Sequence, residues 1–216
     1  MKEKICSQGG FLVLSLYMII NWYGEGSFKI QTGVVTILTD PFDSSVGLSA
    51  PRFKADIILN SGPFPAYKSD KEVEGHSVVG AGEYEIKGVE INGLVAGTGT
   101  IYVVKIEDMK LGFLGQLSSA ALTENAMEMA SGCDILFVPV GGEPYLEPED
   151  AAKLIKKLEP KMVAPSFYAI DGLKRDAKEL KDFEKEFGQK VSPEEKLTIK
   201  IKDITWEGTK LLTLKI

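Results

Sequence analysis

Histidine and cysteine are nearly missing from this 216-residue chain, which has His76, Cys6 and Cys133 and no others. Imidazole and thiolate groups are the usual ligands of zinc and copper, so this scarcity excludes a zinc-finger array and any histidine-rich metal site. A disulfide-stapled scaffold is excluded as well. Cys133 begins an apolar, buried-looking strand and Cys6 lies far upstream, so we expect no disulfide between them and infer a reducing, cytoplasmic location.

Excess basic charge is also missing. Lys and Arg number 25 against 31 Asp and Glu, which gives a net charge of -6, and no basic stripe stands clear of acidic residues. Because phosphate binding needs a basic patch, we expect no nucleic-acid partner. The 44% hydrophobic content argues against disorder, and the length suits one compact domain. A small molecule or another protein remains open as the partner, and a homo-oligomer is possible.

The N-terminal segment resembles a signal peptide, but only superficially. Its apolar run over 11–20 is half as long as a membrane helix, and no small-residue cleavage site follows it. We therefore expect no membrane partner and predict that residues 1–17 are an extension or a mis-assigned start. Residues 18–216 then form one domain. A targeting or tethering role for 1–17 is the alternative.

The pattern of predicted secondary structure changes near the middle of the chain. The first half consists of short β-rich runs punctuated by Gly and Pro, and the second half alternates strands with helices. This order predicts an α/β (α+β) fold, an αββα sandwich with two facing sheets. The predicted strands are 27–31, 34–39, 55–60, a meander over 78–95, 100–106, 110–114, 134–140, 161–164, 197–201 and 209–214, and the predicted helices are 122–130, 148–158 and 173–187.

Four segments in order carry a family resemblance: ILTDPF at 37–42, GEYEIKGV at 82–89, FLGQL at 113–117 and PVGG at 139–142. Together they resemble the Zn-dependent hydrolases of the metallo-β-lactamase superfamily, in its small single-domain branch related to ascorbate-phosphate lactonases. The resemblance covers about residues 19–168, and 197–214 fits the closing strands. It implies an αββα sandwich with His and Asp ligands holding one or two zinc ions at the sheet edge.

The ligand positions of that family are replaced in this sequence. Its HxHxDH loop corresponds to GPFPAY at 62–67, its bridging aspartate to Gln116 and its late histidine to Phe167. These side chains offer no adequate set of zinc donors, so we expect no zinc and no other cofactor. The former ligand positions are Gly62, Phe64, Ala66, Tyr67, Gln116 and Phe167.

The remaining polar residues give weak candidates for a catalytic site. Asp40, Glu25 and Gln116 could form an oxygen-rich pocket for Mg²⁺ or Ca²⁺, although Asp40 before a proline can also cap its own turn. Ser61 could be a nucleophile only if a base lay beside it. His76 is expected to be a surface or structural histidine.

Two functions follow from this pattern. The first is a catalytically silent member of the metallo-β-lactamase fold that acts as a binding or assembly module, with Phe64 and Phe167 plugging the former cleft or lining an apolar pocket. The alternative is a hydrolase of the same superfamily with an unorthodox or metal-free site around Asp40, Glu25 and Gln116.

Overall fold

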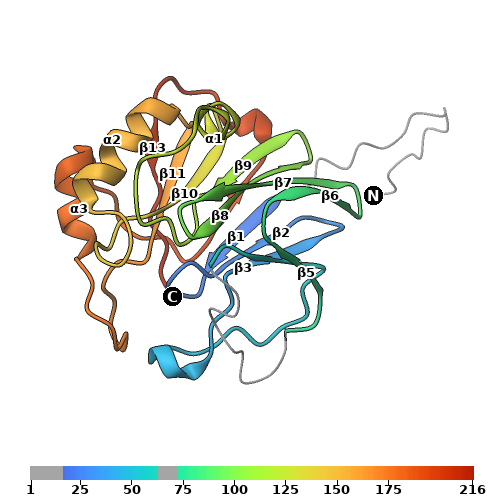
Figure 1. Cartoon of the computed structure of the whole chain (residues 1–216), viewed down its shortest axis with the longest axis horizontal. Helices are drawn as coiled ribbons and strands as arrows, with labels where there is room; N and C mark the ends of the chain where they lie inside the picture. Colours follow the sequence, from blue (N-terminus) through green and yellow to red (C-terminus); the bar gives the residue numbers. More distant parts are fainter. Residues whose placement is uncertain (1–16, 63–72) are drawn as a thin grey trace, which may run out of the picture.

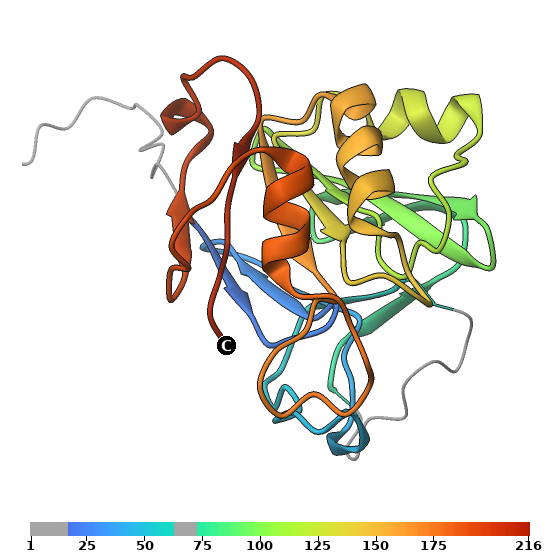
Figure 2. The same ribbon diagram turned by 90° about the vertical axis from the view of Figure 1, so that its left-hand side faces the viewer.

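Two facing β-sheets build the protein in a computed structural model, which describes residues 17–62 and 73–216 (Figures 1 and 2). The first sheet has six strands. In spatial order they are β12 (Leu197–Ile199), β1 (Met18–Trp22), β2 (Phe28–Gln31), β3 (Thr36–Thr39), β4 (Ile57–Asn60) and β5 (His76–Val79).

The second sheet has seven strands. In spatial order they are β13 (Lys210–Leu211), β11 (Met162–Ser166), β10 (Ile135–Pro139), β9 (Met109–Phe113), β8 (Gly99–Ile106), β7 (Val89–Ala96) and β6 (Gly82–Ile86). Strands β6 to β9 form an antiparallel meander in which Glu107 and Asp108, both left-handed, make the last turn.

Each sheet contains a parallel group of strands. Strands β3, β4 and β5 are parallel in the first sheet, and β9, β10, β11 and β13 are parallel in the second. The carboxyl ends of parallel strands meet at one edge of a sheet, which is where open α/β sheets place their ligands. This topology positions the site described below.

The helices are α1 (Glu124–Ala130), α2 (Pro148–Leu158) and α3 (Leu180–Phe187), with short 3₁₀ turns at Ser44–Val46 and Ile201–Asp203. Figures 1 and 2 show α1, α2 and α3 on the side of the seven-stranded sheet. The Thr123 hydroxyl accepts a hydrogen bond from the Ala126 N–H at 3.2 Å, and Pro148 opens α2 as predicted. Across residues 17–62 and 73–216, no helix has the length and apolar character that spanning a bilayer requires.

The αββα sandwich is confirmed, but several local predictions were wrong. The predicted closing strands 197–201 and 209–214 are shorter, since β12 ends at Ile199 and β13 covers only Lys210–Leu211. The predicted helix 173–187 is helical only from Leu180. Upstream of it, Lys174 N–H donates to the Val46 carbonyl at 2.9 Å and Lys178 N–H to the Gly141 carbonyl at 2.7 Å, so these groups do not form helical bonds. The predicted meander over 78–95 also divides, because β5 belongs to the first sheet and the meander begins at Gly82.

An aromatic layer joins the two sheets. Phe28 of β2 and Phe113 of β9 both pack on Phe137 of β10, each with ring centroids 4.6 Å apart. All three rings are buried. The two sheets therefore share one core, which fixes the distance between the strand ends that carry the site.

Replacing Phe137 by alanine tests this layer. The substitution removes a ring packed between two others and leaves a cavity, so we expect the free energy of unfolding to fall by about 3–5 kcal/mol. Denaturant unfolding followed by circular dichroism measures it. The exposed Val34→Ala serves as the control, for which a change of less than about 0.5 kcal/mol is expected. Equal effects of the two variants would contradict the account of the core.

Candidate functional site

Three residues at parallel strand ends form a buried polar cluster. Asp40 follows β3, Ser61 follows β4, and Gln116 lies three residues beyond β9. The Ser61 hydroxyl donates to Asp40 Oδ2 at 2.5 Å and its N–H donates to Oδ1 at 2.7 Å. The Gln116 N–H in turn donates to Ser61 Oγ at 3.0 Å. Both oxygens of the carboxylate are thus held by one serine, which also ties the two sheets together.

Burial dominates the chemistry of Asp40. The side chain is 4% exposed, and desolvation raises the pKa of its carboxyl from 3.8 to about 6, although the two bonds from Ser61 oppose the rise. A carboxyl with this pKa changes protonation state near neutral pH. It could therefore accept a proton from the Ser61 hydroxyl, and it could equally act as a neutral structural group in mild acid.

Glu25 does not join this cluster but pairs with Arg175. Arg175 Nε donates to Glu25 Oε1 at 3.0 Å and to Oε2 at 3.1 Å. Burial raises the pKa of the Glu25 carboxyl, and the charge and hydrogen bonds of Arg175 act in the opposite direction. The carboxylate is thereby paired with a cation from the loop before α3.

Phe167 occupies the space between these two polar groups. It directly follows β11 and is fully buried, and its ring packs on that of Tyr145 with centroids 4.2 Å apart. Arg175 donates from Nη2 to the Phe167 carbonyl. A methyl group on Gly26 would lie 2.6 Å from Phe167 Cζ and 3.0 Å from Asp40 Oδ2, so only glycine allows the ring to come so close.

Three residues of this site have strained backbone conformations. Glu25, Asp40 and Phe167 all have left-handed φ angles, of 49°, 35° and 59°. Such angles are uncommon outside glycine and are found most often at functional sites, where the surrounding packing maintains them. The arrangement is thus typical of a site that once had, or still has, a specific task.

Gln116 and Gly62 lie in direct contact. A Cβ atom on Gly62 would clash with the Gln116 amide, so a histidine at position 62 would need Gln116 to move. The Gln116 Nε2 and Ser27 Oγ atoms are buried and have no hydrogen-bond partner within the part of the chain that the structure describes. Phe64, Ala66 and Tyr67, three of the predicted former ligand positions, lie outside that part.

The imidazole and the thiol of the described residues, His76 and Cys133, lie at the other end of the sheets. His76 begins β5 beside Ile57, four residues before Ser61 on the neighbouring strand, which corresponds to about 13 Å. Cys133 precedes β10, and burial raises the pKa of its thiol to about 12. Among the described residues no three His, Cys, Asp or Glu side chains are grouped to hold a metal ion.

The comparison with known proteins follows this geometry. The sequence profile described as "Beta-lactamase superfamily domain" matches residues 19–166, more than half of the chain. The chain belongs to the metallo-β-lactamase superfamily. The fold and the family predicted from the sequence are thereby confirmed.

Solved structures of this superfamily overlay well. A protein from Thermotoga maritima assigned to its Zn-dependent hydrolases shares 27% identity over 91% of this chain and 100% of its own, with a TM-score of 0.77. The metallo hydrolase Igni18 from Ignicoccus hospitalis has a TM-score of 0.64 and 16% identity, over 86% of this chain and 99% of its own. The metallo-β-lactamase fold protein YhfI from Bacillus subtilis has a TM-score of 0.58 and 8% identity, over 93% of this chain and 97% of its own.

The zinc that this superfamily implies does not fit the donor set seen here. Asp40 has both oxygens bound to Ser61, Glu25 is bound to Arg175, and the ring of Phe167 supplies no donor. The predicted oxygen-rich pocket forms only in part, because Ser61 joins Asp40 to Gln116 while Glu25 is engaged elsewhere.

Sequence reasoning missed part of this site. The chain has only two arginines, yet nothing in the sequence pairs Arg175 with Glu25, 150 positions away. Tyr145 was missed in the same way. The link between Asp40 and Ser61 did leave a signal, because both directly follow apolar strands that prove to be parallel neighbours.

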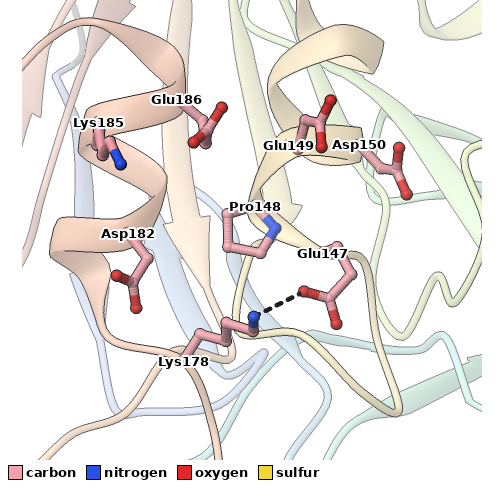
Figure 3. A pocket seen from close by; sticks show the side chains of 8 residues that line it. All are labelled: Glu147, Pro148, Glu149, Asp150, Lys178, Asp182, Lys185 and Glu186. Atoms are coloured by element: carbon pink, nitrogen blue, oxygen red, sulfur yellow. Dashed lines mark ion pairs between the residues drawn. The ribbon is translucent and has the colours of Figure 1, made fainter.

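A second concave region lies apart from the Asp40 cluster. A cavity of about 430 Å³ opens between the first turn of α2 and α3, and Figure 3 shows carboxylates on both of its sides. Lys178 pairs with Glu147 there at 3.3 Å. The side chains that line it are Glu147, Pro148, Glu149, Asp150, Lys178, Asp182, Lys185 and Glu186.

The raised pKa of Asp40 predicts a specific pH dependence. Because the folded protein binds this proton more tightly than the unfolded chain, its stabilising contribution is complete below about pH 4 and is lost as pH rises through about 6. We expect the unfolding free energy of the wild type, minus that of Asp40→Asn, to fall by about 2 kcal/mol from pH 4 to pH 7. Urea unfolding at several pH values measures it.

Asp56→Asn is the matched control. The pKa of Asp56 is lowered by the hydrogen bond from Lys87. The unfolding free energy of the wild type, minus that of Asp56→Asn, is therefore expected to rise with pH and to level off by about pH 5. A difference for Asp40→Asn that stays constant between pH 4 and pH 7 would contradict the assigned environment of Asp40.

Proposed function

We propose that this member of the metallo-β-lactamase superfamily does not hydrolyse substrates through a zinc-bound hydroxide and acts instead as a binding or assembly module. The observation that carries the proposal is the pairing inside the former metal cleft. Ser61 holds both oxygens of Asp40, and Arg175 holds both oxygens of Glu25. Zinc needs three or four convergent donors, and among the described residues no three His, Cys, Asp or Glu side chains are grouped around either carboxylate.

The sequence supports the same proposal independently. The loop at 62–67 contains no His, Cys, Asp or Glu, and the single histidine of the chain is His76 at the far end of the sheet. Hydrolysis in this superfamily needs a metal ion to lower the pKa of a bound water toward 7. Within residues 17–62 and 73–216, no three His, Cys, Asp or Glu side chains are grouped to hold such a metal ion.

One observation favours a metal-free hydrolase as the second candidate function. Ser61 and Asp40 form a short hydroxyl–carboxylate bond, and a carboxylate with a pKa of about 6 can accept a proton at neutral pH. Ser61 Oγ would then attack an ester carbonyl while its proton passes to Asp40 and on to the leaving alcohol. Water would cleave the resulting acyl–serine bond. Ser61 is buried, however, and this favours the structural role.

Hydrolysis assays distinguish the two candidates. The purified protein is incubated with a lactone, a phosphodiester and p-nitrophenyl acetate, each with added zinc and with a chelator. We expect rates equal to those of buffer alone in every case. Ester turnover that persists in chelator and disappears in Ser61→Ala would establish the metal-free hydrolase instead. Turnover that requires zinc would overturn the proposal, and Ser44→Ala, on an exposed turn, controls for the loss of a serine.

A further inference from the structure

We propose that the peptide bond between Asp171 and Gly172 is a site of spontaneous covalent modification, at which the chain isomerises to isoaspartate. The sequence has one Asp-Gly pair, at 171–172, and one Asn-Gly pair, at 92–93. In such pairs the backbone nitrogen of the glycine can attack the side-chain carbonyl carbon of the preceding residue, because glycine has no side chain to hinder the approach. The structure distinguishes the two pairs.

Asp171 and Gly172 are the two central residues of an exposed β-turn. The Leu173 N–H donates to the Ile170 carbonyl at 3.2 Å and closes the turn, and Gly172 has a left-handed φ of 89°. With the residues that the structure describes, the Asp171 carboxylate makes no ion pair and the Gly172 N–H makes no hydrogen bond. Both reacting groups are therefore accessible, and the glycine lets the peptide rotate until its nitrogen reaches the carboxyl carbon.

The Asn-Gly pair lies inside a sheet instead. Asn92 and Gly93 belong to β7, which pairs with β6 on one side and with β8 on the other. Gly93 lies opposite Gly82 and Tyr102 and is buried. Its nitrogen can attack only after the strands separate, which costs the free energy of local unfolding. The structure thus reverses the order expected from the sequence, in which Asn92 would react first because a carboxamide loses ammonia more readily than a carboxyl group loses water.

The reaction at the turn balances with water as the only other reactant. The Gly172 nitrogen forms a bond to Cγ of the protonated Asp171 carboxyl group. The proton of that nitrogen and the carboxyl hydroxyl leave as water, and a five-membered succinimide results. Water then adds to the former main-chain carbonyl carbon and breaks its bond to the nitrogen. The product is isoaspartate, in which the backbone runs through the side chain and is one methylene group longer.

A longer backbone at position 171 displaces the contacts of the loop that follows. The Gly172 carbonyl packs so closely on Gly47 that a Cβ atom there would clash with it. Arg175, three residues further along, pairs with the buried carboxylate of Glu25. The extra methylene group moves this loop away from Gly47 and weakens the pair between Arg175 and Glu25. The inference does not depend on whether the Asp40 cluster is catalytically silent.

Incubation of the folded full chain for several weeks at neutral pH and physiological temperature tests the inference. Trypsin then releases residues 162–174 and 88–105 as two separate peptides, because lysines flank both segments. Isoaspartate at 171 is measured by methylation with an isoaspartyl methyltransferase and S-adenosylmethionine, and deamidation at 92 by its mass change. We expect at least about tenfold more modification at 171 than at 92, because Asn92 reacts only through local unfolding.

The denatured chain is the control. The same incubation in guanidinium chloride should reverse the order, since no strand pairing then protects Asn92. Asp171→Glu keeps the charge but does not readily close the ring, so it should remove the modification from peptide 162–174, whereas Asn92→Gln should leave it unchanged. Absence of isoaspartate at 171 in the folded chain, while the denatured chain forms it there, would overturn the inference. Deamidation at 92 that equals or exceeds isomerisation at 171 in the folded chain would overturn it as well.

Discussion

The bond network around the Asp40 carboxylate is the constraint on which the rest of the site depends. It joins the ends of β3, β4 and β9, and so connects the two sheets at the edge where this superfamily places its metal site. A buried carboxylate is costly unless hydrogen bonds satisfy it. Ser61 supplies such bonds from within the chain, but they offset the cost of burial only in part, because the pKa of Asp40 is still raised to about 6.

Arg175 and Phe167 form a second set of contacts at this site. Arg175 neutralises Glu25, bonds to the Phe167 carbonyl and lies 5.1 Å from the centre of the Tyr145 ring. These contacts also explain why residues 173–179 are not helical, since the loop is held against the sheets by its own polar groups. The pairing of Glu25 and the late start of α3 are therefore two consequences of one set of contacts.

The fold could be predicted largely from the sequence, and the site only in part. Alternating strand and turn signals gave both sheets, and Thr123 and Pro148 marked the starts of α1 and α2, because these signals are local. The family resemblance pointed to Gln116 and Phe167, and the structure places Gln116 beside Ser61 and Phe167 beside Gly26. The ion pair between Glu25 and Arg175 could not, since it depends on a loop conformation that no local pattern encodes. The assignment of β5 to the first sheet likewise depends on tertiary pairing.

The zinc content of the purified protein tests the central claim most directly. The chain is expressed in zinc-supplemented medium, purified without chelator and measured by elemental analysis, with the Thermotoga maritima relative purified in parallel. This account predicts less than about 0.1 zinc per chain, because the carboxylates of the cleft are already paired and the loop at 62–67 offers no donor. About one zinc per chain, lost in Asp40→Asn, would contradict it.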